Sequence, residues 1–243
     1  MVEILQKAIP DEMLEPRRLP GVQPLGEPWL RVDDAYAAQM AHRRGLIADR
    51  RAEVYWLDGA AEMAAAEVLV EALALLPGLG FAVEGRRCVC PDGVEVDLEA
   101  EAPLVVLGKL VQEDICIMEQ RGAEHVLVAA CLCFPARWLL SEKAGRPLLH
   151  IHGAVDHYDE DMARRVQRLF DGVQVGRPLW RFNGLPETEP ELFQPRSVLA
   201  PPRTRPEGAA PYWRAERQCI VRMPESGAVV FSIHTYVVRG AAG

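Results

Sequence analysis

The spacing of apolar positions predicts two helices near the start of the chain. In residues 31–55, four apolar residues fall roughly on one face among charged neighbours: Tyr36, Met40, Leu46 and Ile47. Asp33 or Asp34 can cap this segment. A second pattern, rich in Ala, Leu and Glu, runs over residues 60–76 and stops at a Pro-Gly pair. Two amphipathic segments with a short loop between them predict a helical hairpin.

From residue 81 the apolar period shortens to two, which predicts β-strands. The predicted strands cover residues 81–84, 87–90, 94–97, 114–118, 124–134, 216–222 and 227–238. Turn-forming sequences occur at residues 91–93 and 224–227. Because the segment 124–134 is long and apolar, we expect it at the centre of a sheet.

Helices and loops are predicted around these strands. Residues 135–144 begin with Pro and precede Gly145, and residues 159–170 carry an apolar stripe, so both segments are expected to be helical. Residues 1–28 form an irregular leader, and residues 185–211 hold seven prolines in a long functional or wrapping loop. The predicted fold class is α+β, with antiparallel strands and with helices at the N-terminus and between strands.

Composition narrows the class of protein. The 243 residues suffice for one or two domains, and 49% hydrophobic with 26% charged residues excludes a wholly disordered chain. A net charge of −8 disfavours a general nucleic-acid binder. Charge-free stretches are too short to span a membrane, and the first ten residues lack a signal-peptide pattern. We therefore expect a cytoplasmic protein with no membrane partner and with reduced cysteines.

Four of the six cysteines form two C-x-C pairs, Cys88 with Cys90 and Cys131 with Cys133. On a strand, both members of each pair face the same side. Zinc binding is an alternative, but structural zinc sites usually use C-x-x-C spacing. The apolar neighbours favour buried core thiols.

The histidines are more informative, since the common phosphate loops, the hydrolase elbow and the zinc-protease helix have no match in this sequence. His150 and His152 are separated by one residue, and His157 follows five residues later. Imidazole ligates zinc, copper, non-haem iron and haem iron. The spacing leaves two interpretations open: a metal or haem ligand, or a hydrogen-bonded pair near a turn.

Charged residues in the predicted strands pose a similar question. Glu216 and Arg217 face opposite sides of their strand. A carboxylate suits an ammonium ligand, and a guanidinium suits a carboxylate or a haem propionate. Two interpretations are also open for Asp114, at the start of its strand: a pocket residue or part of an ordinary salt-bridge network. Residues 180–183 could likewise be a packed loop or a pocket wall.

Several blocks, taken in order, resemble one family. They are Leu110–Met118, Cys133–Trp138, Glu142–Pro147, Ile151-His152, Arg177–Asn183, Pro190–Pro195, Arg214–Gln218 and Ser226–Tyr236. In this order they resemble the haem-dependent oxidative N-demethylase family over nearly the whole chain.

The resemblance implies a PAS-like fold, a five-stranded antiparallel sheet with flanking helices, here with an N-terminal helical extension. Residues 1–80 would form the leader and extension and residues 81–243 the haem-binding core, as one integrated domain. The implied cofactor is haem b, whose iron takes one axial histidine. The implied reaction is the O2-dependent demethylation of a small secondary amine such as dimethylamine, with release of formaldehyde. The implied partners are a flavin and iron–sulfur reductase subunit and folate-binding subunits.

Individual roles follow only from this resemblance. It places the axial ligand at His152, with His150 as second choice. The other implied site residues are Arg137, Lys143 and Arg217 for the propionates, Glu216 and Asp114 for the ammonium group, and Tyr236 for substrate or oxygen. The chain departs from the family at residues 153–156, where two prolines are missing, at Gly184 in place of Trp, and at His234 in place of Arg.

Two other functions fit parts of the sequence. A PAS-like sensor could bind haem or another ligand without turnover. A mononuclear metal enzyme could use the cluster of His150, His152, His157 and Asp159, with His234 completing a site of two histidines and one carboxylate.

Overall fold

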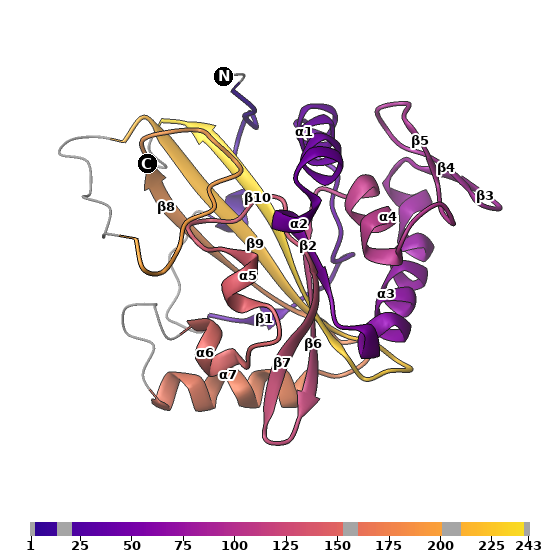
Figure 1. The fold of residues 1–243 in the computed structure, drawn as a ribbon. Helices are drawn as coiled ribbons and strands as arrows, with labels where there is room; N and C mark the ends of the chain where they lie inside the picture. Colours follow the sequence, from indigo (N-terminus) through magenta and orange to yellow (C-terminus); the bar gives the residue numbers. More distant parts are fainter. Residues whose placement is uncertain (1–2, 14–20, 153–159, 201–209, 241–243) are drawn as a thin grey trace.

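The computed structural model describes residues 3–13, 21–152, 160–200 and 210–240. In these residues the largest feature is a sheet of seven strands, in the order β1-β8-β9-β10-β6-β7-β2, with every neighbouring pair antiparallel (Figure 1). The strands are β1 Gln23–Pro24, β2 Tyr55–Leu57, β6 Asp114–Arg121, β7 Glu124–Cys131, β8 Leu179–Glu187, β9 Tyr212–Arg222 and β10 Val229–Arg239. Helices pack on both faces of the sheet, which confirms the predicted mixture of helices and antiparallel strands.

The sheet differs from the expected five strands at its edges. Five strands have 8 to 11 residues each, whereas β1 has 2 and β2 has 3. Such short edge strands carry no readable alternation. The expectation that residues 124–134 lie at the centre was also wrong, because β10 is central and β7 neighbours the edge strand β2. β7 is apolar because helices α4 and α6 contact it.

One face of the sheet, here called the α1 face, is covered by the helices of the first half of the chain (Figure 1). These are α1 Tyr36–Asp49, α2 Arg51–Val54, α3 Glu62–Leu75 and α4 Pro103–Leu110. The predicted helical hairpin is wrong, because α2 and β2 carry the chain to the sheet between α1 and α3. Both helices instead pack against α4. Ala35 occupies the N-cap of α1, and its N–H donates to Asp33 Oδ1 at 2.9 Å.

A second, three-stranded sheet lies beside these helices (Figure 1). It comprises β3 Ala82–Glu84, β4 Arg87–Val89 and β5 Glu95–Asp97, and short 3-10 segments occur at Asp11–Met13, Gly59–Ala61 and Leu76–Leu79. The predicted turn before β5 is present, with Gly93 at a φ of 80°. All six cysteines are buried free thiols, as the apolar surroundings of the C-x-C pairs predict.

The opposite face, here called the α6 face, is covered by α5 Leu140–Lys143, α6 Leu148–His152 and α7 Glu160–Gly172. A separate apolar cluster fills the space between these helices and the sheet. Because side chains alternate along a strand, β9 sends Arg217 and Cys219 to the α1 face and Glu216, Gln218 and Ile220 to the α6 face. The predicted site residues are therefore divided between two sides of one sheet.

Gly108 lets α4 lie close to the sheet. A β-carbon at this position would collide with Cys131 Sγ on β7 and lie 3.1 Å from Ile47 Cδ1. We expect Gly108→Ala to lower the free energy of unfolding by about 1–3 kcal/mol, because the helix must shift to admit the methyl group. Urea denaturation measures the change. Gly45→Ala in α1, where the added atom meets nothing within 4 Å, is the control, and equal losses in both variants would contradict the argument.

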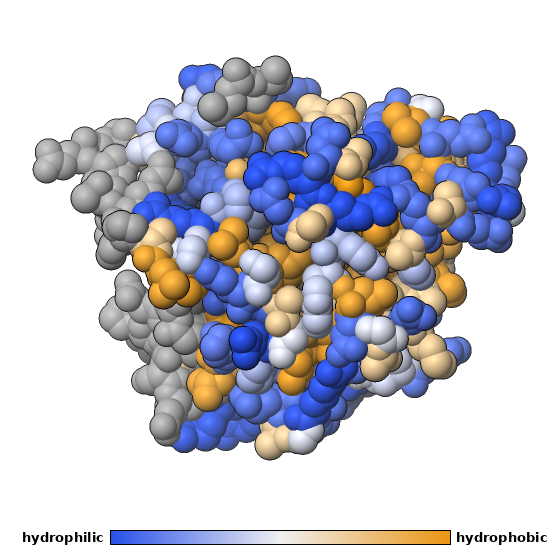
Figure 2. All heavy atoms as spheres, in the orientation of Figure 1, coloured by the Kyte–Doolittle hydropathy of each residue, from blue (hydrophilic) through white to orange (hydrophobic). Residues whose placement is uncertain are grey.

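The leader is bound to the last strand. The N–H of Gln6 donates to Val237 O at 2.9 Å, and the N–H of Val237 donates to Gln6 Oε1 at 2.8 Å. Ile9 is buried in the α1-face core. On the side of the molecule seen in Figure 2, apolar residues are scattered among charged and polar ones. None of the helices in the described ranges has the length and apolar character needed to cross a membrane.

Candidate functional site

The α6 face is polar over part of β8, β9 and β10. Thr235, Glu216 and Asn183 lie opposite one another in neighbouring strands, and Arg181 lies opposite Gln218 in the adjacent row. Opposed residues in an antiparallel sheet project to the same side. Together these five residues form what we call the polar row, in a region where the same face is otherwise packed with aliphatic and aromatic side chains.

Three residues of the polar row are buried and two, Arg181 and Asn183, are half-buried, and the row is incompletely hydrogen-bonded. Glu216, Gln218 and Thr235 are 8%, 8% and 0% exposed. Gln218 Nε2 donates to Glu216 Oε2 at 3.0 Å. Thr235 Oγ1 and Arg181 Nε have no hydrogen-bond partner among the described residues. Unsatisfied buried polar atoms are uncommon in folded proteins and indicate a missing ligand, water or ion.

Arg181 stands out within the polar row. Burial lowers the pKa of its guanidinium, and the charge of Glu216 opposes this shift only in part. The guanidinium is thus a half-buried cation without a full counter-charge. Its role was not singled out from the sequence, although the alternation of Trp180 and Phe182 with Arg181 and Asn183 is the pattern of a strand with one polar face.

Helix α6 is held against the same side of the sheet. Residues 145–147 pair with β7 through backbone hydrogen bonds, including Leu127 N–H to Arg146 O at 3.0 Å. Ile151 packs into the α6-face core, and Lys143 Nζ donates to Ile151 O at 2.5 Å. Lys143 is buried, and burial lowers its pKa. This lysine therefore fixes the helix that carries the predicted ligand His152.

The backbone of His152 ends α6, but its side chain lies outside the described residues, as do His157 and Asp159. His150 lies on the same short helix and is exposed. Of the cluster proposed from H-x-H spacing, the structure thus describes His150 and the backbone of His152. Across the ranges that the structure describes, no group of three or more His, Cys, Asp or Glu residues is arranged to hold a metal.

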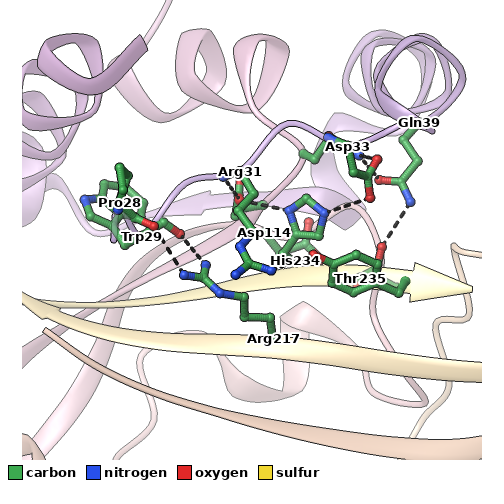
Figure 3. A network of polar contacts seen from close by, with 12 residues as sticks. Pro28, Trp29, Arg31, Asp33, Gln39, Asp114, Arg217, His234 and Thr235 are labelled. Carbon is green, nitrogen blue, oxygen red and sulfur yellow. Dashed lines mark hydrogen bonds and ion pairs between the residues drawn. The ribbon is translucent and has the colours of Figure 1, made fainter. Parts of the chain in front are cut away.

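The α1 face carries a buried charged network (Figure 3). His234 Nδ1 lies 2.9 Å from Glu113 Oε1, and its Nε2 lies 3.1 Å from Asp33 Oδ2. Although burial alone would lower it, the two carboxylates raise the pKa of His234 to about 9. His234 is therefore an imidazolium between two carboxylates at neutral pH. It lies on the far side of the sheet from α6 and cannot complete a metal site with the α6 histidines.

Arg217 and Tyr236 also lie on the α1 face. Arg217 donates to the carbonyl oxygens of Trp29 at 3.1 Å and Pro28 at 3.2 Å (Figure 3). The hydroxyl of Tyr236 accepts from Arg31 Nη1 at 3.3 Å and borders a surface pocket of about 580 Å³. These contacts hold the leader on the sheet, so the structure does not bring Arg217 or Tyr236 together with α6.

Asp114 occupies a third environment. Its Oδ1 accepts from Arg43 Nη1 at 2.6 Å and from the N–H of Cys133 at 2.7 Å, and its Oδ2 accepts from the N–H of Phe134 at 2.9 Å. Both the aspartate and the arginine are buried. Since both carboxylate oxygens are engaged, the geometry favours a structural ion pair over contact with an ammonium ligand.

Arg137 lies at the edge of the α6 side. Its backbone has a φ of 68°, its N–H donates to Gln194 O at 3.0 Å, and its guanidinium pairs with the buried Glu187. This left-handed conformation is uncommon for a residue with a side chain. The contacts join the Pro-rich segment to the start of α5.

Gly184 replaces the tryptophan expected after Asn183. A β-carbon at Gly184 would lie 2.7 Å from the indole of Trp213 on the neighbouring strand β9. The adjacent strand therefore places an aromatic ring beside this position, and the glycine is needed to admit it.

The family suggested by the sequence blocks is confirmed by comparison with known families. A family model described as haem-dependent oxidative N-demethylase, alpha subunit-like, matches residues 21–241. The match includes α6, the five strands with 8 to 11 residues and the helices of the α1 face. The chain belongs to the haem-dependent oxidative N-demethylase alpha subunit-like family.

Proposed function

We propose that this chain is a haem b-binding subunit that removes a methyl group from a small secondary amine in an O2-dependent reaction, releasing formaldehyde. The family membership supports this chemistry. The observation that carries the proposal is the polar row, which leaves buried donors unpaired on the face that also bears α6. The five longer strands, with helices on both faces, are compatible with a PAS-like core.

The residues of the α6 face fit a haem group. His152 would supply the axial ligand, and the cations nearest to α6 and the polar row, Lys143 and Arg181, are the candidates to face its propionates. The charged Arg137 is a more peripheral candidate. When bound, haem b would supply oxygen activation. The protein would supply a pocket that excludes water and orients the amine.

Glu216 is the carboxylate best placed to receive an ammonium group. It is 8% exposed and lies in the middle strand of the polar row. Its Oε1 lies 3.7 Å from Arg214 Nε, which exceeds hydrogen-bond distance. A carboxylate here would bind the amine cation and then accept its proton, leaving the nitrogen lone pair free for oxidation.

The family description names an alpha subunit, which indicates a multi-subunit assembly. We propose that a flavin and iron–sulfur reductase subunit delivers electrons and that folate-binding subunits take up the formaldehyde. We also propose that the assembly acts in the cytoplasm.

Haem reconstitution tests the proposed function. The wild-type protein, supplied with haem b, should show a Soret band in its absorption spectrum. His152→Ala should lose the band or shift it, because the iron loses its axial imidazole. His150→Ala is the matched comparison and should retain it.

A wild-type protein without a Soret band would contradict the proposal. Loss of the band in His150→Ala alone would move the ligand to His150. Formaldehyde release from dimethylamine, with a chemical electron source, then separates an enzyme from a haem-binding sensor.

A further inference from the structure

On the α6 face, strands β8 and β9 carry two arginines, Arg181 and Arg214, near one carboxylate, Glu216. Arg214 and Arg181 share this carboxylate: Arg214 Nε lies 3.7 Å from Glu216 Oε1, and the charge of Glu216 opposes the effect of burial on Arg181 only in part. The two terminal nitrogens of Arg214 are hydrogen-bonded to carbonyl oxygens, since Nη1 donates to Leu192 O at 3.1 Å and Nη2 to Phe134 O at 2.7 Å. Arg214 is thus a structural residue that links β9 to the segments that contain Leu192 and Phe134.

Arg181 is the less compensated of these two cations. Its guanidinium offers five N–H donors, and its buried Nε has no hydrogen-bond partner within the part of the chain that the structure describes. Burying a cation without an anion is costly, and burial accordingly lowers its pKa. Such an arginine can bind a planar anion that accepts two parallel hydrogen bonds.

The neighbours of Arg181 favour a carboxylate. Gln218 lies directly opposite on β9, and Asn183 lies two residues along β8 on the same side. Amide groups of this kind can donate to a carboxylate oxygen. The apolar residues Leu179 and Ile220 form the next row beside Arg181, and an apolar neighbourhood strengthens a charge attraction.

We propose that Arg181 is the anchoring cation of a carboxylate-binding site on the α6 face. Two sources can present this group: a propionate of bound haem, or the carboxylate of an N-methylated amino acid whose ammonium group lies at Glu216. The first source rests on the proposed function, and the second deepens it by naming a zwitterionic amine as the substrate class.

The melting temperature of the ligand-free protein distinguishes a ligand-binding role of Arg181 from a structural one. Arg181→Gln removes a half-buried cation whose Nε has no hydrogen-bond partner, so the melting temperature of the ligand-free protein should stay the same or rise. A structural arginine such as Arg214 would instead cause a large drop when replaced by Gln. Arg168→Gln, on the exposed side of α7, is the matched control for loss of one positive charge.

Binding experiments on the full chain distinguish the two sources. Haem b is titrated by its Soret band, beside haem whose propionates are esterified. If the carboxylate is a propionate, Arg181→Gln should weaken haem b binding about tenfold or more and leave the ester unaffected. If the carboxylate belongs to the substrate, haem binding should not change. N-methylglycine should then raise the melting temperature of the wild type but not of Arg181→Gln.

The haem titrations and melting temperatures decide between these interpretations without a measurement of enzyme activity. Arg181→Gln behaving like Arg168→Gln in both titrations would overturn the carboxylate site, as would a fall in melting temperature equal to that of Arg214→Gln. Should the wild type bind no haem while N-methylglycine still stabilises it through Arg181, the haem proposal fails and the carboxylate site stands. A protein that binds neither ligand contradicts both proposals.

Discussion

Asp114→Ala is expected to lower the free energy of unfolding by about 3–5 kcal/mol, with no ligand present. The substitution removes the partner of Arg43, whose side chain is 0% exposed. It also leaves the backbone N–H groups of Cys133 and Phe134 without their acceptor. An uncompensated buried charge and two orphaned donors act in the same direction, so the loss should exceed that of an ordinary ion pair.

Urea denaturation of the ligand-free protein measures this effect. The control is Glu53→Ala, because Glu53 forms an exposed pair with Arg50 at 2.7 Å and such pairs contribute little to stability. If Asp114→Ala unfolds at the same urea concentration as Glu53→Ala, the structural role is wrong and the ammonium-binding role returns to consideration.

Stability should also fall as the pH rises from about 6.5 to about 9, because His234 holds its proton in the folded state. Burial opposes the charged form, but Glu113 and Asp33 outweigh it and raise the pKa from 6.5 to about 9. A raised pKa in the folded state stabilises the protein below the unfolded-state value, and this contribution disappears as the pH passes the folded-state value. The shift corresponds to about 3 kcal/mol.

Unfolding free energies at a series of pH values, for the wild type and His234→Asn, measure this contribution. The variant lacks the titrating group, so its curve should be flatter between pH 6.5 and 9. Other groups titrate there too, including Cys90, whose pKa is lowered to about 7 chiefly by a hydrogen bond from Cys88. Subtracting the two curves removes those shared terms, and parallel curves would show that His234 is neutral when folded.

Local patterns were sufficient for the elements with a clear period. The alternation in residues 216–222 and 227–238 predicted β9 and β10 together with their hairpin. Apolar residues on one face predicted α1, and a segment rich in Ala, Leu and Glu predicted α3. Helix α4 was missed because its eight residues are nearly all apolar and show no period. Strand β8 was missed because Gly184 and Pro186 interrupt its alternation.

The candidate site was predictable only in part. The alternation placed Glu216 and Arg217 on opposite sides of their strand, but the sequence could not show that α6 covers the side away from Arg217 and Tyr236. That division depends on the parity of each residue along its strand and on which helices cover which face. The significance of Arg181 depends on what does not contact it, and this is visible only after folding.

The place of β10 in the sheet bears on how the protein is made. β10 joins β9 to β6, so one half of the sheet, β1 with β8 and β9, meets the other, β6 with β7 and β2, only through it. On the ribosome, β6 and β7 can form their hairpin early, whereas β8 and β9 can join that half only through β10, which follows them in the chain. Such long-range pairing slows folding and leaves strand edges open. We therefore expect the nascent chain to depend on chaperones until β10 has been synthesised.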